Sequence, residues 1–266
     1  LEIKDEEAGK SNALIRGMCA RFKELGYNYG GFNASVTSEV LSGSGLSSSA
    51  AYEVLIGTIL NYLYNDGKIS AVEIACISQY AENVYLKKPC GLMDQTACSV
   101  GGFVQIDFKD TKNPVINKVD FNLDEFDHAL CIVDTGGNHA DLTDDYAAIR
   151  LEMNSVAEYL GKSVLREVEP SEVFEKMGEI RKKTGDRALE RAIHFYNENR
   201  RVERLASALD KKDFEDFKSI IIESGKSSYM YNQNCFTVKN PESQPVALAL
   251  CLTEELLKGK AAYRVH

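Results

Sequence analysis

A loop of small residues between two apolar segments constrains the fold of this chain more than any other part of its sequence. Residues 32–41 alternate apolar and polar side chains, which is typical of a β-strand with one buried face. Residues 50–64 are strongly apolar and long enough for a helix. Between them, residues 42–49 are serine or glycine except for one leucine. The order of strand, small-residue loop and helix predicts an α/β arrangement that can bind an anion.

The loop itself predicts a phosphate-binding site. Glycine lets the backbone approach a phosphate closely, and the first N–H groups of a helix have no intrahelical partner and favour an anion. The serine hydroxyls can add donors or hold a Mg²⁺ that accompanies the phosphates. The residues predicted to surround a bound phosphate are Gly43, Ser44, Gly45, Leu46, Ser47, Ser48 and Ser49.

Two better-known phosphate loops do not fit this sequence. The loop contains no lysine, which excludes a Walker A motif, and Ser48 stands where a dinucleotide-binding fingerprint has its third glycine. An ordinary serine and glycine turn, with Ser49 as the helix cap, is the simpler alternative. The length of the loop and its place between a strand and a long helix favour the phosphate site.

Hydrophobic periodicity predicts the remaining elements. Further strands are expected at residues 103–108 and 129–133. We expect helices at residues 8–26, 70–86, from 92 to about 101, over most of 142–231, and at 246–258. A domain boundary is expected between residues 125 and 126, where a polar stretch leads into a new strand.

Composition excludes several classes of partner. The net charge of -9 argues against nucleic acid and anionic lipid as primary partners, because these need lysine and arginine. The longest apolar run, Val246–Leu252, is far shorter than the roughly 18 residues of a membrane span. Seven cysteines without a Cys-x-x-Cys pair favour buried thiols in a reducing cytosol, so a cytoplasmic location is expected.

Three segments carry a resemblance to a known family. The run Gly45-Leu46-Ser47-Ser48-Ser49-Ala50 resembles the signature loop of the GHMP kinases. The runs Ala81-Glu82-Asn83 and Cys90-Gly91-Leu92-Met93-Asp94-Gln95 resemble the galactokinase branch of that family, as does the segment 134–150. The resemblance covers nearly the whole chain, and the run ending in Gln95 is its most specific part.

The resemblance implies a fold and two domains. The implied fold is α/β (α+β) with two lobes, the first like the second domain of ribosomal protein S5 and the second ferredoxin-like. Residues 1–125 would then belong to the N-terminal, ATP-binding domain, and residues 126–266 to a truncated C-terminal domain.

The resemblance also implies roles for single residues. Asp94 corresponds to the catalytic base that faces the C1 hydroxyl of galactose. Ser49 and Glu82 correspond to ligands of Mg²⁺, and Gly91 and Tyr146, like Asp94, to positions that contact the sugar. The implied substrates are galactose and ATP.

Three of these residues have a simpler alternative. Asp94 could cap a helix, Glu82 could be a solvated residue on an amphipathic helix, and Tyr146 could be a half-buried core residue. Without the resemblance, the two interpretations of Asp94 are about equal and the solvated interpretation of Glu82 is favoured.

Two galactokinase motifs are absent from the sequence: the early Gly-Arg and Glu-His-x-Asp segment, and the late Gly-Gly-Gly-Phe-Gly-Gly loop. We therefore expect the chain to be a fragment with little activity by itself. The alternatives are a non-catalytic galactokinase-like sensor of sugar and ATP, an N-acetylgalactosamine kinase, and a mevalonate kinase. Such sensors lack a Ser-Ala pair in the loop, and the complete Ser47–Ala50 run therefore favours an enzyme.

Overall fold

The computed structural model of the chain describes residues 1–266 except 8, 41–45, 89, 112, 137–141 and 265–266. The chain forms two compact units, Leu1–Val119 and Asp120–His266. Each unit has a hydrophobic core of its own. The domain boundary between residues 125 and 126 remains a prediction.

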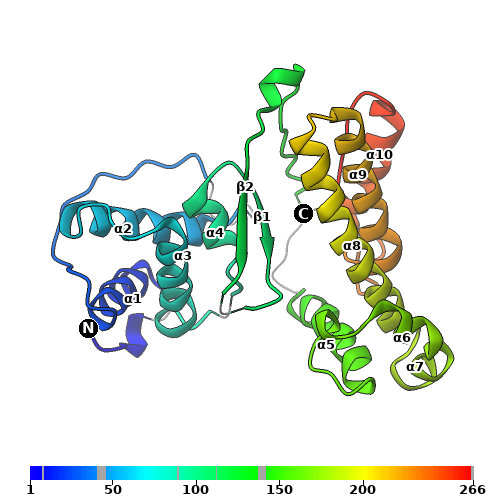
Figure 1. Cartoon of the computed structure of the whole chain (residues 1–266), viewed down its shortest axis with the longest axis horizontal. Coiled ribbons are helices and arrows are strands. Elements are labelled where there is room, and N and C mark those ends of the chain that lie inside the picture. The colour runs from blue at the N-terminus through cyan, green and yellow to red at the C-terminus, as the bar shows by residue number, and fades with distance from the viewer. Residues whose placement is uncertain (8, 41–45, 89, 112, 137–141, 265–266) are drawn as a thin grey trace. The chain divides into compact units, whose positions relative to one another are not determined.

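The first unit is a group of helices beside a two-stranded sheet (Figure 1). Its helices are α1 (Ser11–Glu24), α2 (Ser48–Tyr64), α3 (Ala71–Tyr80) and α4 (Met93–Val100), with a short 3₁₀ turn at Asp5–Glu7. The last turn of α3 continues as a π-helical turn at Ala81–Tyr85. The strands β1 (Phe103–Asp107) and β2 (Val115–Val119) are antiparallel, and Gln105 lies opposite Asn117.

Close packing in this unit depends on two helical glycines. A Cβ at Gly57 of α2 would lie 2.8 Å from the Met18 side chain and 2.9 Å from that of Ile74. A Cβ at Gly17 of α1 would lie 2.9 Å from the backbone of Ala81. The glycines therefore let α1, α2 and the end of α3 approach one another around a core that includes Phe22, which is fully buried.

The second unit is helical in the part that the structure describes. It contains α5 (Thr143–Tyr159), α6 (Pro170–Glu175), α7 (Met177–Thr184), α8 (Asp186–Asp210), α9 (Phe214–Ser227) and α10 (Pro245–Leu257). Two 3₁₀ turns lie at Leu123–Phe126 and Leu165–Glu167, and a π-helical turn at Ser228–Asn232 follows α9. The long helix α8 packs against α5, α7 and α9.

Two strand predictions are wrong. Residues 32–40 form no strand, and the side chains of Val36 and Val40 are exposed rather than buried. Residues 129–133 form none either, and Leu130 is 77% exposed. A strand exists only when a second segment pairs with its backbone N–H and C=O groups, and no described segment pairs with either of these.

The helix predictions are confirmed to within a few residues, and so is the strand at 103–108. Strand β2 was not predicted. None of the helices in the described part of the chain is long and apolar enough to cross a membrane.

Candidate active site

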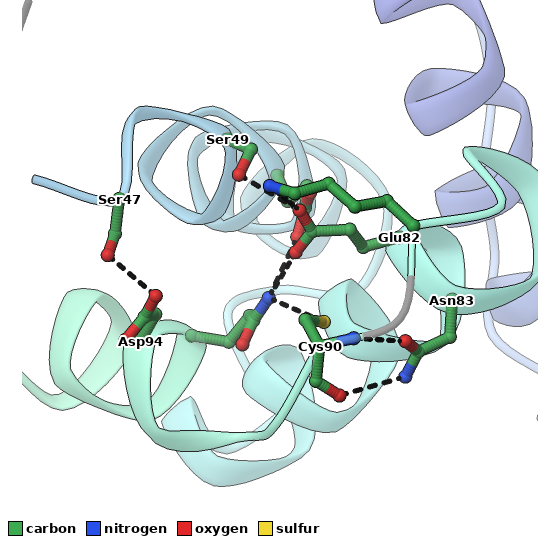
Figure 2. Close-up of polar contacts among 9 residues, drawn as sticks. Ser47, Ser49, Glu82, Asn83, Cys90 and Asp94 are labelled. Carbon is green, nitrogen blue, oxygen red and sulfur yellow. Dashed lines mark hydrogen bonds and ion pairs between the residues drawn. The ribbon is translucent and has the colours of Figure 1, made fainter. Parts of the chain in front are cut away.

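The serine loop ends in a strained residue that precedes helix α2. Ser47 adopts a φ of 57°, in the left-handed region that a residue with a side chain seldom occupies. Such a conformation costs about 1 kcal/mol or more and is often found at functional sites. The Ser47 hydroxyl does not cap α2 but donates to Oδ2 of Asp94 at 2.6 Å, as Figure 2 shows. The last residue of the loop before the helix therefore lies against the predicted base.

Asp94 is held by helix α4, of which it is the second residue. Helix α4 packs against α2 and α3, and the side chains of Gln95 and Thr96 on α4 are buried. Asp94 is itself half-buried beside the start of α2. Packing by its own helix thus fixes this carboxylate next to the loop, and it does not cap a helix: the cap position of α4 is Leu92.

Glu82 lies on the π-helical turn that ends α3 and is only 2% exposed. Irregular turns of this kind are frequent at functional sites because they redirect a side chain out of the helical register. Oε1 of Glu82 accepts hydrogen bonds from Ser49 Oγ at 3.0 Å and from Lys88 Nζ at 3.0 Å. Oε2 accepts one from Gln95 Nε2 at 2.7 Å.

The solvated interpretation of Glu82 is therefore wrong. Burial by itself would raise the pKa of the Glu82 carboxyl, but the hydrogen bonds that it accepts, first from Lys88, outweigh burial and hold its pKa below the usual value. The same contact raises the pKa of the Lys88 ammonium. A buried negative charge thus lies beside the start of α2.

Asn83 holds the segment that joins the π-helical turn to α4. Its Oδ1 accepts a hydrogen bond from the backbone N–H of Cys90 at 2.7 Å, and its Nδ2 donates to the backbone C=O of Cys90 at 3.4 Å (Figure 2). Burial raises the pKa of the Cys90 thiol to about 12, so this cysteine is a poor nucleophile.

The structure therefore brings Ser47, Ser49, Glu82 and Asp94 into one cluster (Figure 2). Ser48 is half-buried at the first position of α2, and Leu46 is 36% exposed beside it. Gly43, Ser44 and Gly45 lie outside the described residues.

The two residues predicted to contact only the sugar lie on the surface of their units. Gly91 is exposed in the first unit, where an added Cβ would meet nothing within 4 Å. Tyr146 belongs to helix α5 of the second unit and is 59% exposed, so the alternative that it is a half-buried core residue is wrong.

Sequence analysis assigned no role to four residues that surround the cluster: Glu53, Asn83, Lys88 and Gln95. Asn83 and Gln95 lie in the runs that carry the family resemblance, but nothing in those runs indicates which atoms they contact. Glu53 had a signal in the sequence: it is the only charged residue of the predicted helix 50–64. It stands four positions after Ser49 and therefore lies on the same face.

Comparison with known proteins identifies the class to which this cluster belongs. Residues 13–102, which contain Ser47, Ser49, Glu82 and Asp94, match the family described as "GHMP kinases N terminal domain". Residues 13–102 therefore form a GHMP kinase N-terminal domain.

Within that family, similar curated proteins are galactokinases. The chain is 31% identical to the galactokinase of Clostridium tetani, over 84% of this chain and 57% of the relative. It is 30% identical to the galactokinase of Thermotoga petrophila, over 87% of this chain and 63% of the relative. It is 33% identical to that of Actinobacillus pleuropneumoniae, over 75% of this chain and 49% of the relative. The chain thus spans about half to three fifths of the length of these relatives.

A solved structure confirms the fold. The chain superposes on the Lactococcus lactis galactokinase, which was solved in complex with galactose, with a TM-score of 0.68 at 22% identity. The match covers 87% of this chain and 59% of that protein. The predicted fold class, α/β (α+β) of the GHMP kinase type, is confirmed, with the described residues mostly helical around a small sheet.

Proposed function

We propose that the protein containing this chain transfers the γ-phosphate of ATP to the C1 hydroxyl of galactose, giving galactose 1-phosphate and ADP. The observation that carries the proposal is the 2.6 Å hydrogen bond from Ser47 to Asp94, because it joins the serine loop and a carboxylate in one site. Phosphoryl transfer needs this juxtaposition of a phosphate cradle and a group that can accept a proton from the acceptor hydroxyl. The names of the relatives support galactose as the substrate.

The proposed roles are those that the resemblance to the galactokinases implies, and the hydrogen bonds of Ser47, Ser49, Glu82 and Asp94 support part of them. The loop from Gly43 to Ser49 and the first N–H groups of α2 bind the phosphates of ATP. Asp94 accepts the proton of the sugar hydroxyl as it attacks, a contribution of about 10²–10⁴-fold to the rate. Gly91 and Tyr146 contact the sugar. Among the described residues, none lies within 4 Å of the place that a Cβ at Gly91 would take, which is consistent with a ligand that approaches its backbone.

Ser49 and Glu82 are the residues that would hold Mg²⁺. Their oxygens Oγ and Oε1 are 3.0 Å apart, and neighbouring ligands on one octahedral Mg²⁺, with bonds of about 2.1 Å, are separated by about 3 Å. The ammonium of Lys88 lies 3.0 Å from the same carboxylate oxygen, so a bound Mg²⁺ would compete with Lys88 for this oxygen.

No group of three or more acidic, histidine or cysteine side chains in the described part of the chain could form a metal site by itself. Mg²⁺ needs only one or two carboxylates, because phosphates and water supply its other ligands. When bound, the cation would neutralise charge on the transferred phosphoryl group.

The activity is proposed for the whole protein. The 266 residues span about half to three fifths of the curated relatives, so we expect little turnover from these residues alone. A cytoplasmic location stays a prediction.

ADP release by the complete gene product tests the proposal. The reaction would contain Mg-ATP and, in separate assays, galactose, N-acetylgalactosamine, glucose or mevalonate. We expect turnover on galactose, and a loss of about 10²–10⁴-fold in kcat for Asp94→Asn with nucleotide binding retained. The matched control is Asp66→Asn, which removes an exposed aspartate of the same unit and should leave turnover unchanged.

Two results would change the proposal. A folded, ATP-binding protein that releases no ADP with any acceptor would be a sensor rather than an enzyme. Turnover on N-acetylgalactosamine without turnover on galactose would keep the kinase and the base but replace the substrate.

A further inference from the structure

A buried acidic residue lies behind the candidate site. Glu53 is on helix α2, one turn after Ser49, and its side chain is fully buried. Gln95, the residue after Asp94 on α4, is 1% exposed. Its Nε2 donates to Oε2 of Glu82 at 2.7 Å and lies 3.4 Å from Oε2 of Glu53. One buried amide therefore bridges carboxyl groups from two different elements.

Two oxygens of this bridge have no hydrogen-bond partner among the described residues. They are Oε1 of Glu53 and Oε1 of Gln95, both buried. Unpaired buried polar atoms are costly and therefore rare in folded proteins. The two oxygens belong to side chains that already share one hydrogen bond. A second hydrogen bond between these oxygens would therefore pair both of them.

A neutral carboxylic acid at Glu53 would satisfy both oxygens together. Its O–H would donate to Oε1 of Gln95 while its other oxygen accepts from Nε2, which gives a doubly bonded acid–amide pair. Burial, and then the Glu82 carboxylate, raise the pKa of Glu53 to about 8, which agrees with a neutral acid at pH 7.

We propose that Glu53 is a positioning residue that acts through Gln95: it fixes the amide with its nitrogen toward Glu82, and thereby holds Oε1 of Glu82 facing Ser49. This rests on the proposed function, in which Ser49 and Glu82 hold the cation that accompanies ATP. An amide turned the other way would place its oxygen against the Glu82 carboxylate.

A purely structural role would not require an acid at this position. Among the other buried side chains on the same helix, Val54, Ile56 and Leu60 fill the core without polar atoms, and Asn61 carries a neutral amide that pairs with the backbone of Ile69. A carboxyl group in such surroundings is costly to bury, and is expected only where its hydrogen bonds are used.

The test measures how strongly Mg²⁺ enhances nucleotide binding to the complete gene product. Calorimetry with ADP, in the presence of Mg²⁺ and separately in EDTA, gives the ratio of the two affinities. Residues that orient a metal ligand typically change metal affinity by about 10–100-fold. We expect Glu53→Leu to lower the ratio by about tenfold or more, and Glu53→Gln, which keeps one donor and one acceptor for Gln95, to restore most of it.

Ile56→Ala is the matched control for lost stability. Ile56 is 3% exposed on the same helix but outside the hydrogen-bonded group, so this variant should lower the melting temperature without changing the ratio. If Glu53→Leu does not fold, Gln95→Met removes the amide that links Glu53 to Glu82, together with its own hydrogen bond to Glu82, and should lower the ratio at least as much.

The outcomes separate this inference from the proposed function. A ratio unchanged in Glu53→Leu or Gln95→Met, with galactose turnover present in the wild type, overturns the positioning role and leaves the kinase intact. If Mg²⁺ does not change the affinity of the wild-type protein for ADP, and the protein releases no ADP with any sugar, both the positioning role and the proposed function are overturned.

Discussion

Ser47 combines a strained backbone with the hydrogen bond that joins the loop to Asp94. Two substitutions separate the effect of the backbone strain from the effect of the hydroxyl. Glycine and alanine both lack the hydroxyl, but glycine tolerates a positive φ and alanine does not. Strain that persists at such a site must be compensated by its surroundings.

We expect Ser47→Gly to be more stable than Ser47→Ala by about 1 kcal/mol, measured by urea denaturation. The matched pair is Ser48→Gly and Ser48→Ala. Ser48 is the first helical residue of α2, where alanine should be the more stable of the two. If alanine were more stable than glycine at position 47 as well as at position 48, the left-handed conformation of Ser47 would be contradicted.

Glu53 should make stability depend on pH. In the folded state its pKa is raised, first by burial, from 4.5 to about 8. Between these values the folded protein keeps a proton that the unfolded chain has lost, so stability falls as pH rises through this window and levels off above about 8.

We expect the free energy of unfolding of the wild type to fall relative to Glu53→Gln between pH 5 and 8, by up to about 1.4 kcal/mol per pH unit. Urea denaturation at four pH values measures this difference in the free energy of unfolding. The control is Glu6→Gln, which changes an exposed residue. Parallel curves for the wild type and Glu53→Gln would mean that Glu53 is ionised throughout.

Sequence motifs located the polar contacts of the site only in part. They named Ser49, Glu82 and Asp94, which lie together in the structure. They did not reveal that Lys88 and Gln95 complete the surroundings of Glu82, because these contacts depend on how a loop and a helix fold back on the π-helical turn. Spacing along a chain carries little information on such contacts.

At the scale of elements, helices α1 and α3 determine where Glu82 points. The π-helical turn that carries it packs directly on α1 at Gly17, where an added Cβ would lie 2.9 Å from Cα and Cβ of Ala81 and 3.0 Å from Cβ of Tyr85. Backbone atoms cannot move aside as a flexible side chain can, so a larger residue must displace the turn.

Gly17→Ala should therefore destabilise the first unit by about 1–3 kcal/mol and weaken the Mg²⁺-dependent binding of nucleotide. Gly178→Ala is the control, because Gly178 lies in helix α7 with open space around it and should gain up to about 1 kcal/mol from helix propensity. Thermal unfolding distinguishes the two. An equal gain in both variants would show that α1 and the turn are not in close contact.

The elements differ in how far the sequence determines them. Helical periodicity is a local property, and α1, α2, α8 and α10 lie close to where it predicted them. Alternation at residues 32–41 did not produce a strand over the described residues 32–40, because a strand also needs a partner that no local pattern specifies. Strand β2 is as long as β1 but escaped prediction, because its sequence Val-Ile-Asn-Lys-Val neither alternates nor is continuously apolar, and pairing with β1 forms the strand.

At the scale of the whole molecule, the two units have separate cores. Ile77 belongs to the core of the first unit and Ile180 to that of the second, and both are almost fully buried. An aromatic group of Phe121, Phe126, Phe214 and Phe217 joins the start of the second unit to α9. Each unit can therefore be destabilised separately.

We expect Ile77→Ala and Ile180→Ala each to cost about 2–5 kcal/mol, but in different parts of the chain. Hydrogen exchange followed by mass spectrometry should show faster exchange within residues 1–119 for the first variant and within 120–266 for the second. Equal acceleration over the whole chain in both variants would mean that the units unfold as one.

The paired hydrogen bonds between Asn83 and the backbone of Cys90 have a consequence for the thermodynamics of ligand binding. These hydrogen bonds fix the segment between Glu82 and Asp94 when the protein folds, and not when a ligand binds. The loss of chain entropy that fixes these two carboxylates relative to each other is therefore complete before any ligand arrives. The affinity for a ligand that contacts both carboxylates then depends on those contacts. Little of the binding free energy is lost to ordering this part of the chain.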